Sequence, residues 1–245
     1  MSRHAEIFFE PDGIPARAAS PAEEQAAKNG KRIQGTPSSD DEIAKLVQSV
    51  FRAGNGGEHA RTVAFCGVNG GVGASWVCAR TAELLARGHA GRVCLVDANV
   101  RRPSLHAQFE VDRAPGFLEL LQSERAASDF TRSVIEGRLW LVPAGAPKQA
   151  LNGSFHTEKL MQRLTELRSE FEFVLLDTPA LDVHPDAVLL GQWTDGIVLV
   201  VGCDTTRRET ARNAKLSFET AQIPVLGAVL NKRKFPIPEA IYRSI

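Results

Sequence analysis

Short apolar runs alternate with amphipathic segments along most of the chain. Several of the apolar runs carry hydrophobic residues at nearly every position, as strands buried on both faces of a sheet do. These runs lie at 61–67, 92–98, 139–145, 171–179, 196–202 and 224–231. Helical periodicity occupies most of the intervening segments, at 75–87, 155–170, 183–192 and 206–221. The alternation predicts an α/β fold: a doubly wound, mostly parallel sheet with helices on both faces.

A further amphipathic helix is predicted before the first strand. Ser39 and Glu42 fit a capping box at its start, and Thr206 and Glu209 fit another at the last predicted helix. Apolar residues recur at helical spacing after the first box, at Ile43, Leu46, Val47, Val50 and Phe51.

The two ends of the chain differ in composition from the alternating region. Residues 1–38 are rich in Ala, Pro, Glu, Gly and Ser without a sustained period, which predicts a disordered leader. Residues 39–235 form one predicted α/β domain, and 236–245 a short C-terminal tail.

Charge and cysteine content narrow the range of partners. Lys+Arg and Asp+Glu balance at 29 each, so no global charge attracts nucleic acid or anionic lipid. Four cysteines without a Cys-x-x-Cys pair indicate reduced, buried thiols and a cytoplasmic location. No apolar run approaches the ~20 residues that a membrane-spanning helix needs. We therefore expect no nucleic-acid partner and no direct membrane span.

The stretch "GVNGGVGASW" at 67–76 follows the first strand and opens a helix. Glycines let the backbone N–H groups of such a loop turn toward an anion, and the helix N-terminus adds partial positive charge. A tight glycine turn without a ligand is the alternative interpretation. The predicted cofactor-binding positions in this loop are Asn69, Gly70, Gly71, Val72, Gly73, Ala74, Ser75 and Trp76.

Two aspartates each end an apolar strand, Asp97 in "VCLVDANVRRPSLH" and Asp177 in "FVLLDTP". Ligands of parallel sheets bind outside the carboxyl ends of the strands, so these residues are candidate catalytic groups. Together with Ser75 they are also the candidate Mg²⁺ ligands. Arg101 is a candidate phosphate contact, and Arg101 or Arg102 could supply positive charge from the side. A surface loop and a capping aspartate are the plainer alternatives.

These motifs resemble, in order and spacing, those of bacterial tyrosine kinases, which belong to the MinD/ParA-like P-loop group and control capsule and exopolysaccharide synthesis. The similarity runs from near Asp40 to near Lys232 and rests most specifically on "DANVRRPSLH". It implies a P-loop NTPase fold with ATP or ADP and Mg²⁺ as cofactors. By position it implies Ser75 as a Mg²⁺ ligand, Asp177 as the Walker B acid, and Asp97 near the metal and the attacking group. Asn231, at the end of the last strand, would recognise adenine.

The sequence departs from that family at several positions. Three site positions lack a charged residue that the family carries. Ala74 and Asn69 stand in place of lysines, and Asn99 stands in place of an acid. The family's Glu-x-x-Arg-x-x-Arg assembly motif is matched here by Glu42, Lys45 and Gln48. Where the family carries a cluster of C-terminal tyrosines, this chain has only Tyr242.

The missing charges affect binding less than catalysis. Loss of one charge-assisted hydrogen bond to phosphate costs about 1.5–3 kcal/mol of binding. Loss of one placed donor slows phosphoryl transfer by ~10²–10³. We therefore expect a weakly nucleotide-binding or catalytically impaired regulatory partner in exopolysaccharide or capsule biosynthesis. An active ATP-dependent protein-tyrosine kinase and a ParA/MinD-like positioning ATPase are the alternatives.

The resemblance also implies a partner, a membrane chain-length or polysaccharide co-polymerase-type protein. That partner would hold the chain at the inner face of the membrane. A homo-oligomer is possible as well.

Overall fold

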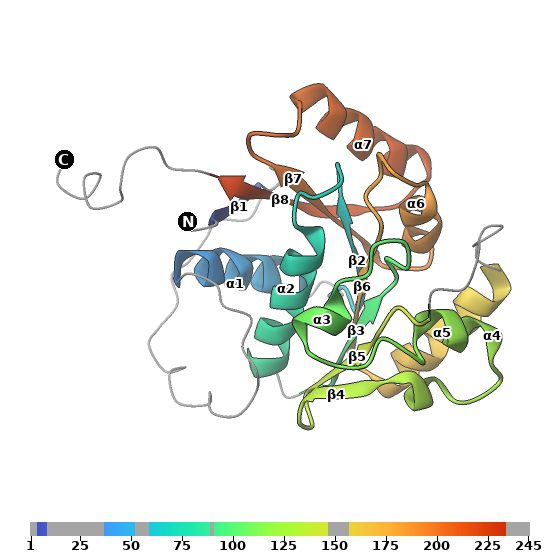
Figure 1. Ribbon diagram of the computed structural model, residues 1–245. Coiled ribbons are helices and arrows are strands. Elements are labelled where there is room, and N and C mark those ends of the chain that lie inside the picture. The colour runs from blue at the N-terminus through green and yellow to red at the C-terminus, as the bar shows by residue number, and fades with distance from the viewer. Residues whose placement is uncertain (1–3, 9–36, 52–58, 89–90, 147–156, 234–245) are drawn as a thin grey trace.

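The computed structural model describes residues 4–8, 37–51, 59–88, 91–146 and 157–233 (Figure 1). Most of the predicted leader, the predicted tail at 236–245 and Tyr242 lie outside the described residues.

One sheet of eight strands runs through the molecule in the order β1-β8-β7-β2-β6-β3-β5-β4. The outer pairs β1–β8 and β4–β5 are antiparallel, and the inner neighbours are parallel. The strands are β1 (His4–Phe8), β2 (Thr62–Gly67), β3 (Val93–Asp97), β4 (Arg132–Ile135), β5 (Leu139–Val142), β6 (Phe173–Asp177), β7 (Gly196–Gly202) and β8 (Val225–Arg233).

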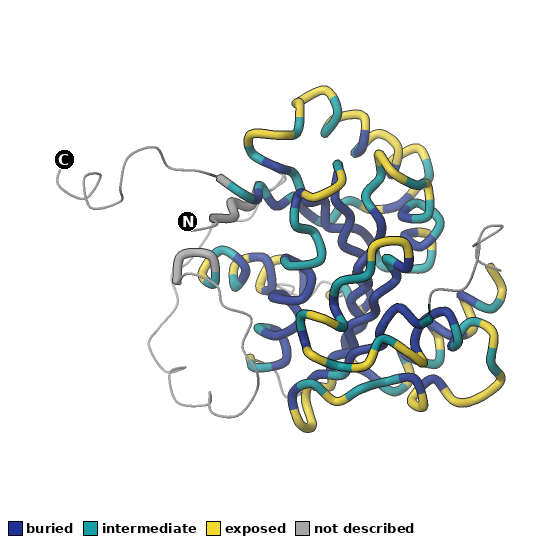
Figure 2. Tube along the Cα trace, viewed as in Figure 1, coloured by how far each residue is buried: buried dark blue, intermediate teal, exposed yellow. Residues whose placement is uncertain are grey.

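Helices cover both faces of this sheet (Figure 1). They are α1 (Pro37–Phe51), α2 (Ala74–Gly88), α3 (Leu105–Gln108), α4 (Phe117–Gln122), the 3₁₀ helix η1 (Ala127–Phe130), α5 (Thr157–Glu170), α6 (Asp186–Gly191) and α7 (Arg208–Thr220). One hydrophobic cluster joins α1, α2 and α3 to one face, and a second joins α4–α7 and η1 to the other. The central strands are buried between these two layers (Figure 2). The predicted doubly wound α/β class is confirmed.

The chain leaves β2 and β6, which are neighbours in the sheet, toward opposite faces. The connection after β2 enters α2 in the first hydrophobic cluster, and that after β6 enters α6 in the second. Doubly wound sheets bind ligands at the carboxyl ends of two strands that diverge in this way.

A buried ionic group fixes α2 against α1. The Arg80 guanidinium, 2% exposed, donates to both carboxylate oxygens of Asp40 at 2.8 and 2.6 Å and to Glu83 at 2.5 Å. Since a buried arginine must be fully paired to be tolerated, this group ties the orientation of α2 to the start of α1.

Four local predictions differ from the structure. Residues 4–8 of the predicted leader form β1, which pairs with the edge of β8, and the short edge strand β4 was not predicted at all. Helix α1 begins at Pro37, so Ser39 lies inside it rather than at its N-cap. Arg207 is the N-cap of α7 and no side chain caps that helix. The Thr206 hydroxyl instead accepts the Gly202 N–H at 3.0 Å, because the turn after β7 needs that acceptor.

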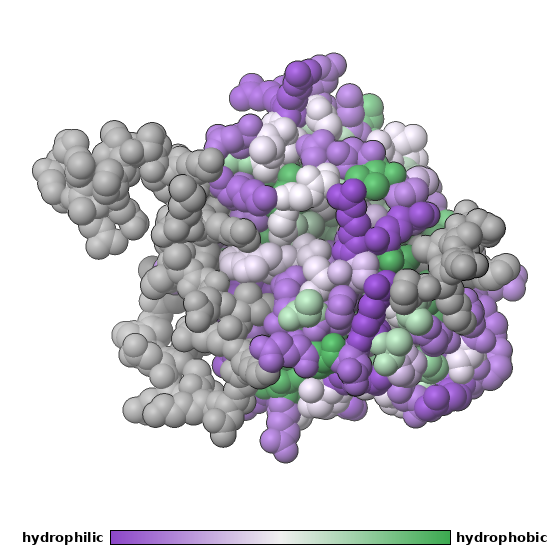
Figure 3. Space-filling view, in the orientation of Figure 1, coloured by the Kyte–Doolittle hydropathy of each residue, from purple (hydrophilic) through white to green (hydrophobic). Residues whose placement is uncertain are grey.

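The four cysteines are free, and three of them are buried. No helix within the described ranges is both long and apolar enough to cross a bilayer. On the face shown in Figure 3, apolar residues form small separate groups among hydrophilic ones.

Candidate functional site

The glycine loop joins the carboxyl end of β2 to the start of α2. Gly71 and Gly73 have φ of 79° and 90°, a left-handed conformation that residues with a side chain rarely adopt. The 15-residue helix α2 starts at Ala74, directly after the second of these glycines. Its first N–H groups have no partner within the helix and carry the positive end of the helix dipole. The loop therefore has the backbone shape and the helix start of an anion-binding turn.

A carboxylate from the segment after β6 contacts the beginning of this loop. Asp182 accepts the Gly70 N–H at 3.0 Å and the side-chain amide of Asn69 at 3.2 Å. Asp182 is exposed. The first part of the loop thus already bonds an anionic group of the chain itself.

The end of β8 contacts the rest of the loop. Asn231, 2% exposed, donates its side-chain amide to the Val72 carbonyl at 2.9 Å and accepts the Lys232 N–H at 2.8 Å. The Lys232 ammonium donates to the Gly71 carbonyl at 2.5 Å. An adenine contact by Asn231 would use the second amide hydrogen or the second lone pair of the side-chain oxygen.

Asp97 and Asp177 lie side by side at the carboxyl ends of β3 and β6. They are directly opposed in the parallel register of the two strands, and both are completely buried. Asp97 accepts the Leu105 N–H at 3.1 Å through one oxygen. Within the described ranges, its other oxygen and both oxygens of Asp177 lack a partner at hydrogen-bond distance and angle, although the Ser75 hydroxyl lies close enough to favour the charged form of Asp177. Three buried carboxylate oxygens in one place are thus left unsatisfied.

Burial makes ionisation of this pair unfavourable. It raises the pKa of Asp97 to about 7, against the opposing effect of nearby backbone N–H groups and the Arg113 charge. Burial also raises the pKa of Asp177 well above its ordinary value; the Asp97 charge adds to this, while the Ser75 hydroxyl opposes it. Both carboxyl groups would become easier to ionise beside a cation.

The unsatisfied oxygens fit a divalent cation such as Mg²⁺, which prefers oxygen ligands. Across the described ranges, no group of three or more His, Cys, Asp or Glu side chains is placed to hold a metal ion. A cation here would therefore use Asp97 and Asp177 with the Ser75 hydroxyl, and would complete its shell with water or phosphate oxygens, as Mg²⁺ commonly does.

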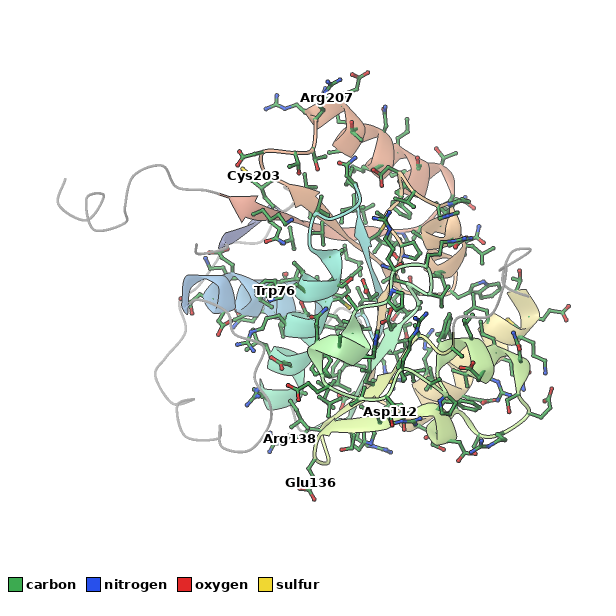
Figure 4. All side chains as sticks on the ribbon, viewed as in Figure 1. Trp76, Asp112, Glu136, Arg138, Cys203 and Arg207 are labelled. Carbon is green, nitrogen blue, oxygen red and sulfur yellow. The ribbon has the colours of Figure 1, made fainter. Side chains whose placement is uncertain are left out.

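Two other predicted ligand contacts are engaged elsewhere. Arg101 bonds Asp186, at the start of α6, with 3.1 Å between the guanidinium and the carboxylate. Trp76, in the first turn of α2, packs against the hydrophobic cluster of α1 and α2 (Figure 4). The structure brings together the loop, Ser75, Asp97, Asp177 and Asn231, and directs the other two side chains to internal contacts.

Lys232 and Asp182 contact the loop although neither was predicted to do so. Lys232 directly follows the predicted strand end at Asn231. The sequence did contain a signal for this contact: a cation next to that strand end, in a chain that lacks the loop lysine. No pattern marked Asp182, because its position depends on the turn after β6.

One family model and two known proteins are similar to this chain in sequence. The family model described as "Cellulose biosynthesis protein BcsQ" matches residues 60–216. The chain is 29% identical to tyrosine-protein kinase YwqD of Bacillus subtilis, covering 67% of this chain and 69% of YwqD. It is 28% identical to putative tyrosine-protein kinase EpsB of Ralstonia solanacearum over 69% of this chain, but spans only 22% of EpsB.

Solved structures share the fold. The chimeric protein CapA2B2 superposes with a TM-score of 0.70 at 22% identity, covering 82% of this chain and 87% of the other. The MinD cell division protein of Aquifex aeolicus superposes with a TM-score of 0.56 at 19% identity, covering 68% and 66%. The sheet and its helices are therefore those of MinD/ParA-like P-loop proteins.

Proposed function

The chain belongs to the family of the cellulose biosynthesis protein BcsQ, and from this membership we propose that it is a nucleotide-binding regulatory partner in exopolysaccharide or capsule biosynthesis. It binds ADP or ATP with Mg²⁺ weakly and is impaired in catalysis. The names of its relatives, tyrosine-protein kinase YwqD and putative tyrosine-protein kinase EpsB, support descent from an ATP-using protein.

One observation carries this proposal: the buried, unpaired Asp97–Asp177 couple beside the glycine loop. Leaving carboxylate oxygens buried without partners is unfavourable, and a bound ion is one of the partners that native folds supply to such groups. A magnesium–diphosphate unit would supply the cation to the carboxylates and the anion to the start of α2. Bound magnesium would also neutralise charge on the phosphate chain.

The composition of the loop supports binding over catalysis. Ala74 provides no ammonium group for the terminal phosphates, and Asn69 provides none at the start of the loop. Backbone N–H groups and the helix start remain, so affinity falls by roughly ten- to 150-fold relative to a loop with lysine. Phosphoryl transfer depends on charge placed for the transition state, and each missing donor slows it by about 10²–10³.

The proposed role includes a membrane-bound partner in polysaccharide assembly, which would hold the chain at the inner face of the membrane. Nucleotide state would then alter how the chain contacts that partner rather than drive rapid turnover.

Thermal unfolding with Mg²⁺–ADP and Mg²⁺–ATP tests the proposal. A ligand that binds only the folded state must raise the midpoint, by about 2.7 kcal/mol of stability at 100 times its Kd. We expect a rise at millimolar nucleotide that disappears with EDTA, together with ATP turnover that barely exceeds background. An unchanged midpoint would refute nucleotide binding, and rapid turnover would refute catalytic impairment.

An active protein-tyrosine kinase is the second candidate, favoured by the retention of Asp97, Asp177 and a cation at the loop in Lys232. It predicts phosphotyrosine on Tyr242 or on a partner protein after incubation with Mg²⁺–ATP and a membrane polysaccharide co-polymerase-type protein. Phosphotyrosine formation that is lost in Asp97→Asn would favour this candidate, and its absence would favour the regulatory role.

A further inference from the structure

The side chain of Lys232 folds back from the end of β8 onto the glycine loop. Its ammonium donates to the Gly71 carbonyl at 2.5 Å. Its backbone is left-handed, with φ of 63°. Lysine rarely adopts this conformation, because the Cβ atom crowds the backbone. The contacts around Lys232 must therefore compensate for an unfavourable local geometry.

Asn231 provides part of that compensation. Its side-chain oxygen accepts the Lys232 N–H, and its amide donates to Val72. A Cβ atom at Gly73 would lie 2.6 Å from the Asn231 amide nitrogen and 3.9 Å from Cε of Lys232. Both side chains thus lie directly against the turn that leads into α2. Glycine at position 73 is what permits this close approach.

Three carboxyl groups lie at or near the loop. Asp182 contacts its beginning, and Asp97 and Asp177 lie buried nearby. Arg101 is paired with Asp186. Of the cations in the part of the chain that the structure describes, Lys232 is the one that bonds the loop, and no carboxylate there pairs with it. An ammonium group has three donors, and the Gly71 carbonyl takes one of them.

We propose that Lys232 is the phosphate-binding cation of this site and supplies, from the last strand, the charge that position 74 lacks. The inference rests on the proposed function, since it requires a nucleotide diphosphate or triphosphate at the loop. The ammonium keeps its place at the loop and turns its remaining donors to the phosphate oxygens. Lys232 thereby binds and positions the phosphate chain, with no covalent step.

The proposal distinguishes Lys232 from a residue that merely supports the loop. A supporting hydrogen bond can be lost without changing how binding depends on salt. A cation that pairs with phosphate makes affinity fall as ionic strength rises, because salt screens that attraction. The salt dependence of binding is therefore the readout that a structural role would not change.

The test uses calorimetric titration of the full-length protein with Mg²⁺–ADP and with inorganic pyrophosphate. Lys232→Gln should weaken both ligands about ten-fold, as expected for loss of one charge-assisted bond, and should flatten the salt dependence. Lys232→Arg should retain most of the affinity. Adding Ala74→Lys to Lys232→Gln should restore binding, because the charge is then supplied from the loop.

Lys159→Gln is the matched control, since Lys159 pairs with Glu124 on the α5 side of the sheet. It should leave both affinities unchanged. If the unaltered protein binds Mg²⁺–ADP and Lys232→Gln binds it equally well with the same salt dependence, the inference is wrong while the proposed function stands. If the unaltered protein binds neither ligand at millimolar concentration, the proposed function fails and the inference with it.

Discussion

The two halves of the site differ in how far their polar groups are satisfied. The loop half is bonded to its own chain at Gly70, Gly71 and Val72. The carboxylate half contains three buried oxygens of Asp97 and Asp177 with no partner in the described ranges. Each unpaired buried polar group destabilises the fold, whereas each internal bond of the loop stabilises it.

We infer from this difference that the proposed ligand would interact differently with the two halves. At the carboxylates, a cation would fill a need that the fold leaves open. At the loop, a phosphate would have to compete with an existing carboxylate and add to an existing lysine contact. We therefore expect the metal side to dominate the energetics of binding and the loop side to adjust its strength.

The largest effect should follow from removing a carboxylate. Asp177→Asn removes a proposed Mg²⁺ ligand and should reduce Mg²⁺-dependent nucleotide affinity by at least about 100-fold, since even changes beside a metal ligand cost 10–100-fold. Titration with ADP at fixed Mg²⁺ measures this loss. The control is Asp112→Asn, an exposed aspartate near β4 and far from the loop (Figure 4). Equal affinities of Asp177→Asn and the unaltered protein would contradict a metal role.

Introducing a lysine at position 74 should strengthen phosphate binding in the loop half of the site. Ala74→Lys should tighten ADP binding by roughly ten- to 150-fold, the value of one charge-assisted bond to phosphate. Gln192→Lys adds the same charge at the exposed C-terminal end of α6 and should change nothing. Unchanged affinity in Ala74→Lys would mean that the loop does not face a phosphate.

The unsatisfied carboxylates should also make metal-free stability depend on pH. The pKa of Asp97 rises from 3.8 to about 7 in the folded state. Below the lower value both states are protonated. Between pH 3.8 and about 7, Asp97 keeps a proton in the folded state that the unfolded chain has released. The free energy of unfolding therefore falls by up to about 1.4 kcal/mol for each unit by which the pH rises. Above pH 7 this loss is complete.

Thermal midpoints in EDTA from pH 4 to 8 measure this dependence. The midpoint of Asp97→Asn minus that of the unaltered protein should increase from pH 4 to 7 and then level off. Each kcal/mol corresponds to about 2–4 °C for a chain of this size. Mg²⁺ should reduce the difference by pairing with the carboxylates. A constant difference across the range would show that Asp97 is not strained by burial.

The smallest effect should come from the acid that contacts the loop. Asp182→Asn removes a negative charge beside the proposed phosphate position while keeping an acceptor for the Gly70 N–H. Because Asp182 is exposed, the gain in ADP affinity should be only about two- to five-fold, in the range of surface charge interactions. Weaker binding in this variant would mean that Asp182 assists the ligand rather than competing with it.

The parts of this site that follow from local pattern were predictable. Apolar runs ending in Asp97 and Asp177 identified two strands of a parallel sheet, and glycine spacing identified the loop. Both aspartates end strands whose burial requires continuous hydrophobicity, so their positions at the sheet edge are fixed by sequence alone.

Contacts that depend on tertiary geometry were not predictable. Lys232 reaches the loop because its backbone turns left-handed after Asn231, and lysine gives no signal for that conformation. Arg101 was expected near phosphate, but α6 presents Asp186 to it. Thr206 fitted a helix cap, but the turn after β7 competed for the same hydroxyl. In each case a neighbour distant in sequence, or a turn, overrode the local pattern.

The bond between Val72 and Asn231 joins positions 159 residues apart. During synthesis on the ribosome, the glycine loop emerges long before the strand that holds it. Its own strand β2 also has to wait for β6 and β7, between which it lies. In a nascent chain the proposed nucleotide site is therefore not assembled until β8 has been translated, and only the finished domain could respond to ATP or ADP.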